Sequence, residues 1–108
     1  MKILLDAMGG DNGPDANIKG AINAINQIKA ELVLIGKEEI IREKVKEFYG
    51  KTLEEISPRL KVKNATETIE MEDKPTDSIK HKKDSSMVVG FRMLKEGEGD
   101  VFISAGNS

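Results

Sequence analysis

One short segment limits the possible folds more than any other. Residues 32–35 (LVLI) are consecutively apolar, and Gly36 closes the run. A strand with one face in water alternates apolar and polar side chains, whereas a continuous apolar run is typical of a strand that is covered on both faces. Such strands occur in parallel sheets with helices packed on either side. The segment therefore predicts an α/β fold.

The rest of the chain surrounds this segment with alternating strand and helix patterns. Further strands are predicted at residues 2–6, 60–64 and 101–103, and apolar residues recur at helical spacing over 14–30, 40–50 and 85–96. This alternation predicts one α/β domain over residues 1–108, with a mostly parallel sheet flanked by helices. Because nothing follows the loop after the last strand, we expect a truncated form of such a domain.

Composition excludes several classes of function. A formal net charge of -2 gives no broad positive field for nucleic acid, so no nucleic-acid partner is expected. The chain has no cysteine, which rules out disulfides, thiolate metal sites and cysteine nucleophiles. It also lacks a signal-peptide pattern and any run approaching the ~20 apolar residues that span a bilayer. We therefore expect a cytoplasmic protein.

Two loops are expected to meet at one edge of the sheet. The carboxyl ends of parallel strands converge on the ligand site in such folds, and residues 9–13 and 104–107 each follow a predicted strand. Glycines after a strand let backbone N–H groups approach an anion, with the next helix pointing its positive end there. The first loop, with Gly9, Gly10 and Asp11, also fits a tight connection without a ligand. Asp6 and Asp11 also fit cap or turn positions.

A basic segment precedes the last predicted helix. Residues 80–86 (KHKKDSS) gather cations and hydroxyl groups where that helix begins, which is the chemistry that suits a phosphate group. Taken alone, a basic run of this length is more often a solvated surface than a phosphate site, and both interpretations stay open. The single histidine, His81, is interpreted as an exposed bystander. The nearby acidic residues are interpreted as hydrated side chains and not as metal ligands; they are Glu70, Glu72 and Asp73.

Three blocks of sequence, taken in order, resemble the phosphate acyltransferase family called PlsX. They are residues 6–11 (DAMGGD), residues 71–75 (MEDKP) through 82–87 (KKDSSM), and residues 104–107 (SAGN). The resemblance runs over essentially the whole chain. The combination is far more specific than any one of its motifs.

This resemblance implies an activity. PlsX enzymes transfer a fatty acyl group from acyl carrier protein to inorganic phosphate, and the acyl phosphate then serves a membrane glycerol-3-phosphate acyltransferase in phospholipid synthesis. The resemblance implies a fold like that of isopropylmalate dehydrogenases and phosphotransacetylases, with no metal or redox cofactor. It also implies cytoplasmic homodimers that can touch the membrane surface.

The resemblance also implies a site. Phosphate is itself the nucleophile, so the protein must hold an anion beside a thioester carbonyl and stabilise the oxyanion that develops. Asn107 is the candidate donor to that oxyanion. The residues expected to bind phosphate or substrate are Gly9, Gly10, Asp11, Lys82, Lys83, Asp84, Ser85, Ser86, Ser104 and Gly106.

Two departures from the family pattern matter. Lys80 stands where related chains commonly carry arginine, which keeps the charge but loses a bidentate grip on phosphate. Ser108 stands at a threonine position from which the family continues into a helix and a longer remainder. We therefore expect an incomplete and inactive form of the enzyme. Two alternatives stay open, a non-catalytic module that binds phosphate or acyl carrier protein, and another phosphate- or nucleotide-binding α/β protein such as a dehydrogenase relative.

Overall fold

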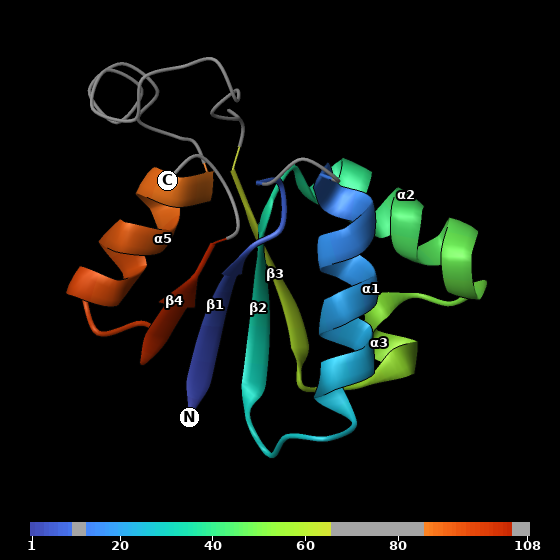
Figure 1. Ribbon diagram of the computed structural model, residues 1–108, viewed down its shortest axis with the longest axis horizontal. Helices are drawn as coiled ribbons and strands as arrows, with labels where there is room; N and C mark the ends of the chain where they lie inside the picture. The colour runs from blue at the N-terminus through green and yellow to red at the C-terminus, as the bar shows by residue number, and fades with distance from the viewer. Residues whose placement is uncertain (10–12, 66–85, 105–108) are drawn as a thin grey trace.

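The computed structural model describes residues 1–9, 13–65 and 86–104, drawn in colour in Figure 1. Over these residues strands and helices alternate as the sequence predicts. The elements in chain order are β1 (Lys2–Asp6), α1 (Gly13–Ile25), β2 (Glu31–Gly36), α2 (Glu38–Tyr49), α3 (Leu53–Ile56), β3 (Leu60–Asn64), α5 (Ser86–Lys95) and β4 (Val101–Ile103).

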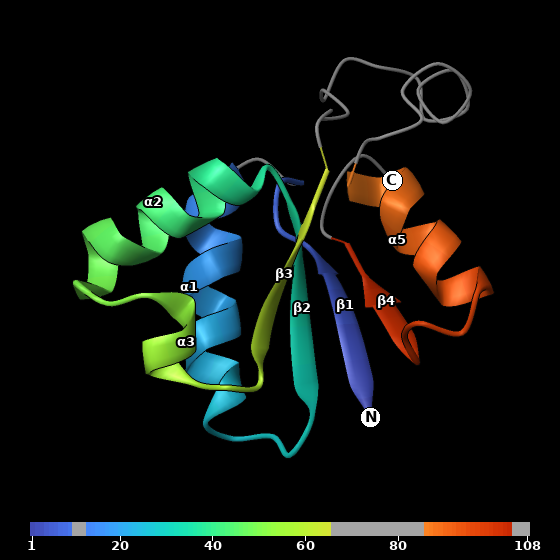
Figure 2. The same ribbon diagram turned by 180° about the vertical axis from the view of Figure 1, so that it is seen from behind.

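The four strands form one parallel sheet in the order β3-β2-β1-β4. Figures 1 and 2 show α1, α2 and α3 on one face of this sheet and α5 on the other. The strand order reverses beside β1, which pairs with β2 on one side and with β4 on the other. The predicted α/β fold with a parallel sheet flanked by helices is confirmed. The crevice at such a reversal, beyond the carboxyl ends of the strands, is where α/β sheets bind ligands.

Strand β2 is covered on both faces, as its unbroken apolar run predicts. Leu32 and Leu34 belong to the core cluster beneath α1 and α2, whereas Val33 and Ile35 belong to the cluster beneath α5. All four side chains are at most 5% exposed. The alternation of side chains along a strand therefore supplies two separate cores from one apolar segment.

Helix α1 is shorter than its sequence periodicity predicts. The apolar spacing continues to residue 28, but the helix ends at Ile25. The guanidinium group of Arg59 donates hydrogen bonds to the carbonyl oxygens of Ile25 (2.8 Å), Ile28 and Ala30 (3.5 Å). Arg59 thus places a cation on the carbonyl of the last helical residue and on two carbonyls beyond it, which satisfies groups that have no partner within the helix and stabilises the turn that follows.

The other helix ends follow local signals. Gly50 caps the C-terminal end of α2 and Gly97 follows the end of α5, and both glycines have the left-handed conformation, with φ of 66° and 78°. The short helix α3 was not predicted from the sequence. Its start carries a capping box, in which Thr52 and Glu55 each accept a hydrogen bond from the other's backbone N–H. Among the described helices, none combines the length and apolar character needed to cross a membrane.

Candidate functional site

The side chain of Asp6 lies at the carboxyl end of β1 and is 3% exposed. Its Oδ1 atom accepts hydrogen bonds from the backbone N–H groups of Met8 (3.0 Å) and Gly9 (3.2 Å). The carboxylate therefore shapes the start of the glycine-containing loop that follows the strand. The backbone N–H groups of Met8 and Gly9 point toward the Asp6 carboxylate, which holds this part of the loop in place.

Two serine hydroxyls also donate hydrogen bonds to this carboxylate. Ser86, at the start of α5, donates to Asp6 Oδ1 at 2.5 Å, and Ser104, directly after β4, donates to Asp6 Oδ2 at 2.9 Å. These partners lie 80 and 98 positions from Asp6 in the chain. We call Asp6, Ser86, Ser104 and the two loop amides the Asp6 cluster. Figure 1 shows why it can form: the end of β1, the start of α5 and the end of β4 share one edge of the sheet.

The directions of these hydrogen bonds limit what the cluster can do. A serine hydroxyl has one hydrogen to donate, and in this arrangement both serines give it to Asp6. Neither hydroxyl then has a hydrogen left to donate to a phosphate oxygen. An anion beside Asp6 would also meet a like charge, so phosphate binding at this edge requires cations from elsewhere. The cluster is built to tie three segments together.

Asn17 holds the same loop from the other side. Its Nδ2 atom donates to the carbonyl oxygens of Ala7 (3.0 Å) and Gly9 (2.7 Å). Asn17 was not among the site residues predicted from the sequence. Asp6 was predicted as the first residue of the block at residues 6–11 or as a cap or turn residue, and not as a site residue. A usable signal was present for Asp6, because an acidic residue that closes an apolar strand beside the reversal of strand order lies at the ligand edge. Asn17 carried no comparable signal.

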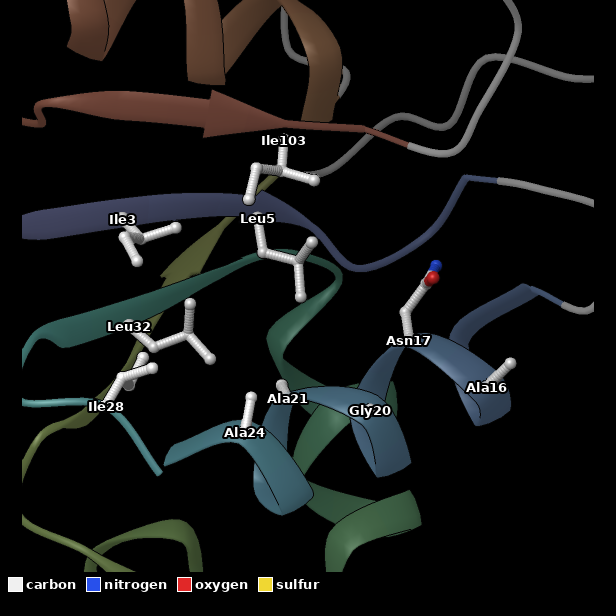
Figure 3. A pocket seen from close by; sticks show the side chains of 10 residues that line it. All are labelled: Ile3, Leu5, Ala16, Asn17, Gly20, Ala21, Ala24, Ile28, Leu32 and Ile103. Carbon is white, nitrogen blue, oxygen red and sulfur yellow. The ribbon is translucent and has the colours of Figure 1, made fainter. Parts of the chain in front are cut away.

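An apolar groove of about 380 Å³ runs between α1 and the sheet (Figure 3). Residues of β1, β2, β4, α1 and the segment between α1 and β2 line it, and Asn17 is the single polar side chain among them. In Figure 3, Asn17 lies at one end of the groove, whereas Ile3, Ile28 and Leu32 lie toward the other. The remaining lining residues are Leu5, Ala16, Gly20, Ala21, Ala24 and Ile103.

The structure brings together three of the predicted site residues, Gly9, Ser86 and Ser104, around Asp6. The predicted substrate-binding and oxyanion residues that lie outside the described residues are Gly10, Asp11, Lys82, Lys83, Asp84, Ser85, Gly106 and Asn107. The same holds for His81 and for the acidic residues Glu70, Glu72 and Asp73. Over residues 1–9, 13–65 and 86–104, no three His, Cys, Asp or Glu side chains are grouped as a metal site would require.

Comparison with known proteins shows that the whole chain matches one protein family. The sequence model of the family described as "Fatty acid synthesis protein" matches residues 1–108. A phosphate acyltransferase of Acetivibrio thermocellus is 50% identical over 109 residues, which cover 100% of this chain and 31% of that protein.

Phosphate acyltransferases of other bacteria match the chain in the same way. The Clostridioides difficile protein is 44% identical over 108 residues, covering 100% of this chain and 30% of that protein. The Methylococcus capsulatus protein is 41% identical over 107 residues, covering 98% and 30%. The chain thus spans about 30% of the length of these relatives. Because the family match extends from the first residue to the last, the chain belongs to the PlsX family of fatty acid synthesis proteins.

Proposed function

We propose that this chain contributes to acyl transfer from acyl carrier protein to inorganic phosphate, which yields an acyl phosphate. One observation in the structure carries the proposal. The Asp6 cluster joins Asp6, Ser86 and Ser104, and each of them belongs to one of the three sequence blocks that resemble phosphate acyltransferases. Segments far apart in the chain therefore meet where an α/β sheet offers its ligand site.

The chemistry needs a held anion and a stabilised oxyanion, and it needs no nucleophile from the protein. Within the proposal, Lys82 and Lys83 supply the positive charge for phosphate, and Asn107 donates to the oxyanion. Support for this division of roles comes from the Asp6 cluster, because Ser86 and Ser104 already donate their hydroxyl hydrogens to Asp6. The serines then set where the neighbouring segments begin, and the lysines and Asn107 contact the reactants.

The proposal includes the partners that the family resemblance implies. Acyl carrier protein is the acyl donor, a second copy of the chain forms a homodimer, and a membrane acyltransferase consumes the product. Because the relatives are about three times as long as the segment they share with this chain, residues 1–108 form one wall of the site within this proposal. The chain by itself is then expected not to turn over.

A chimera tests the proposal. Residues 1–108 replace the matching segment of the Acetivibrio thermocellus phosphate acyltransferase, and formation of acyl phosphate is measured from acyl carrier protein thioester and phosphate. We expect activity in the parent enzyme and the chimera and none in the chain alone. A folded chimera without activity beside an active parent would refute the proposal. Saturable binding of carrier protein by the chain, together with that result, would favour the non-catalytic module.

Variants of the chimera test the roles of single residues. Replacing Lys82 and Lys83 together by alanine is expected to raise the KM for phosphate at least tenfold, because two charges leave the anion site. Lys95→Ala is the matched control, since Lys95 is an exposed lysine at the far end of α5 from Ser86. Equal KM values for the double variant and the control would refute the assignment of phosphate binding to these lysines.

A further inference from the structure

The groove between α1 and the sheet lies on the face opposite α5. Ile3 and Leu5 of β1 and Ile103 of β4 point into it, as Figure 3 shows. Ile103 is 48% exposed although it is a large apolar side chain in a strand. This part of the sheet therefore offers an open apolar surface directly beside the reversal of strand order.

The helix wall of the groove is made of small residues. Ala16, Gly20 and Ala24 line it, and a Cβ atom built on Gly20 would meet no heavy atom within 4 Å. Elsewhere on the same helix, Ile18 and Ile25 are 0% exposed and pack into the core. Helix α1 thus fills the core on one side and leaves space on the other.

The groove has one polar end, and this end belongs to the site loop. Asn17 lines the groove and also donates to the carbonyl oxygens of Ala7 and Gly9. Leu5 and Ile103 directly precede Asp6 and Ser104 in the chain. The apolar lining therefore leads up to the edge of the sheet that carries the Asp6 cluster. This arrangement suits a ligand with a long apolar body and one polar end.

We propose that this groove binds the alkyl chain of a linear acyl group, with the polar end of that group toward the edge of the sheet that carries the Asp6 cluster. The proposal rests on the proposed acyl transfer and adds the place where the acyl chain lies. The volume of about 380 Å³ falls within the range of small-molecule sites. An alkyl chain needs no hydrogen bond, whereas an extended peptide would bury backbone N–H and C=O groups against an apolar lining.

Binding of saturated fatty acids to the chain tests the groove directly. Octanoate, decanoate and dodecanoate are titrated into isotope-labelled protein while amide resonances are followed. We expect saturable shifts at Gly20, Ala24 and Ile103, and an affinity that rises roughly threefold to fourfold for each added methylene, because each buried methylene contributes a similar increment. Absence of saturable binding in both the chain and the chimera would overturn the proposal.

A filling variant separates a ligand site from a structural gap. Gly20→Leu places a side chain in the groove, and we expect it to weaken dodecanoate binding at least tenfold. Its thermal stability should not fall, since leucine is a better helix former than glycine and the space is open. Asn23→Leu is the matched control, because Asn23 is exposed on α1 and does not line the groove. Equal dodecanoate affinity of Gly20→Leu and the control would overturn the proposal.

Measurements on the chimera distinguish a failure of the groove proposal from a failure of the proposed acyl transfer. An inactive chimera that still binds dodecanoate in the groove would refute the catalytic role and leave the site standing. In an active chimera, Gly20→Leu should shift the preference toward shorter acyl chains. A loss of activity that is equal for all chain lengths and accompanied by lower stability would mean that another part of the protein fills the groove, which overturns the proposal.

Discussion

Replacing Asp6 by alanine removes the acceptor of four hydrogen bonds at once. The donors are two loop amides at 3.0 and 3.2 Å and the hydroxyls of Ser86 and Ser104 at 2.5 and 2.9 Å. A buried donor left without a partner costs about 1–3 kcal/mol, and partly buried donors recover some of this from water. We therefore expect Asp6→Ala to lower the free energy of unfolding by about 3–6 kcal/mol. That is a large share of the ~5–15 kcal/mol typical of a domain.

Urea unfolding followed by far-ultraviolet circular dichroism measures this loss. Because Asp6→Ala can leave too little stability to measure, Ser86→Ala and Ser104→Ala serve as milder variants, each expected to cost about 1.5–3 kcal/mol through one hydrogen bond to a charged group. Combining Asp6→Asn with Ser86→Ala should cost less than the sum of the two single changes, because both remove the same contact. An unfolding free energy within about 0.5 kcal/mol of the unchanged chain, for Asp6→Ala or for both serine variants, would contradict this role of the Asp6 cluster, because ordinary surface substitutions have effects of that size.

Three further predictions concern the scaffold. Arg59→Lys should lower the free energy of unfolding by about 1–2 kcal/mol and speed amide hydrogen exchange at the end of α1. The reason is that one ammonium group cannot replace the forked contacts of the guanidinium group to the carbonyl oxygens of Ile25 and Ala30. Unchanged exchange would contradict this. Gly90→Ala should lower the free energy of unfolding by about 1–3 kcal/mol despite better helix propensity, because the new methyl group overlaps the Phe102 ring. Adding Phe102→Leu should restore part of the loss. A higher melting temperature for Gly90→Ala alone would refute the overlap. The hydrogen bond from the backbone N–H of Thr52 lowers the pKa of Glu55 below its ordinary value of 4.5. The ionised carboxylate therefore stabilises the fold at pH values above 4.5, and this contribution is lost as the pH falls through the lowered pKa. Glu55→Gln should therefore reduce stability at neutral pH and flatten the acid limb of the stability curve, and superimposable pH curves for the two proteins would count against this role.

The sequence was sufficient for the fold class because the relevant signals are local. The unbroken apolar run at residues 32–35 indicates burial on both faces, and the strand predicted at 60–64 coincides with β3. Helix ends were predictable where a glycine stops the helix, as at Gly50 and Gly97. The end at Ile25 was not predictable in this way, because the carbonyl of Ile25 is bound by Arg59, more than thirty positions away in the chain.

Part of the candidate site was also accessible from sequence. The family resemblance selected Ser86 and Ser104, and the rule that loops meet at the carboxyl edge selected the loop containing Gly9. The roles of Lys82, Lys83 and Asn107 rest on the resemblance and remain predictions.

The amino-acid sequence alone was enough to establish the parallel α/β architecture and the family, because apolar periodicity and motif order can be read along the chain. Only the tertiary structure placed Asp6 at the centre of the candidate site, since its partners Ser86 and Ser104 approach it only when α5 lies on the second face and β4 pairs beside β1. The groove has the same origin. Its lining joins Gly20 to Ile103, and no local pattern indicates that these two residues face a common space.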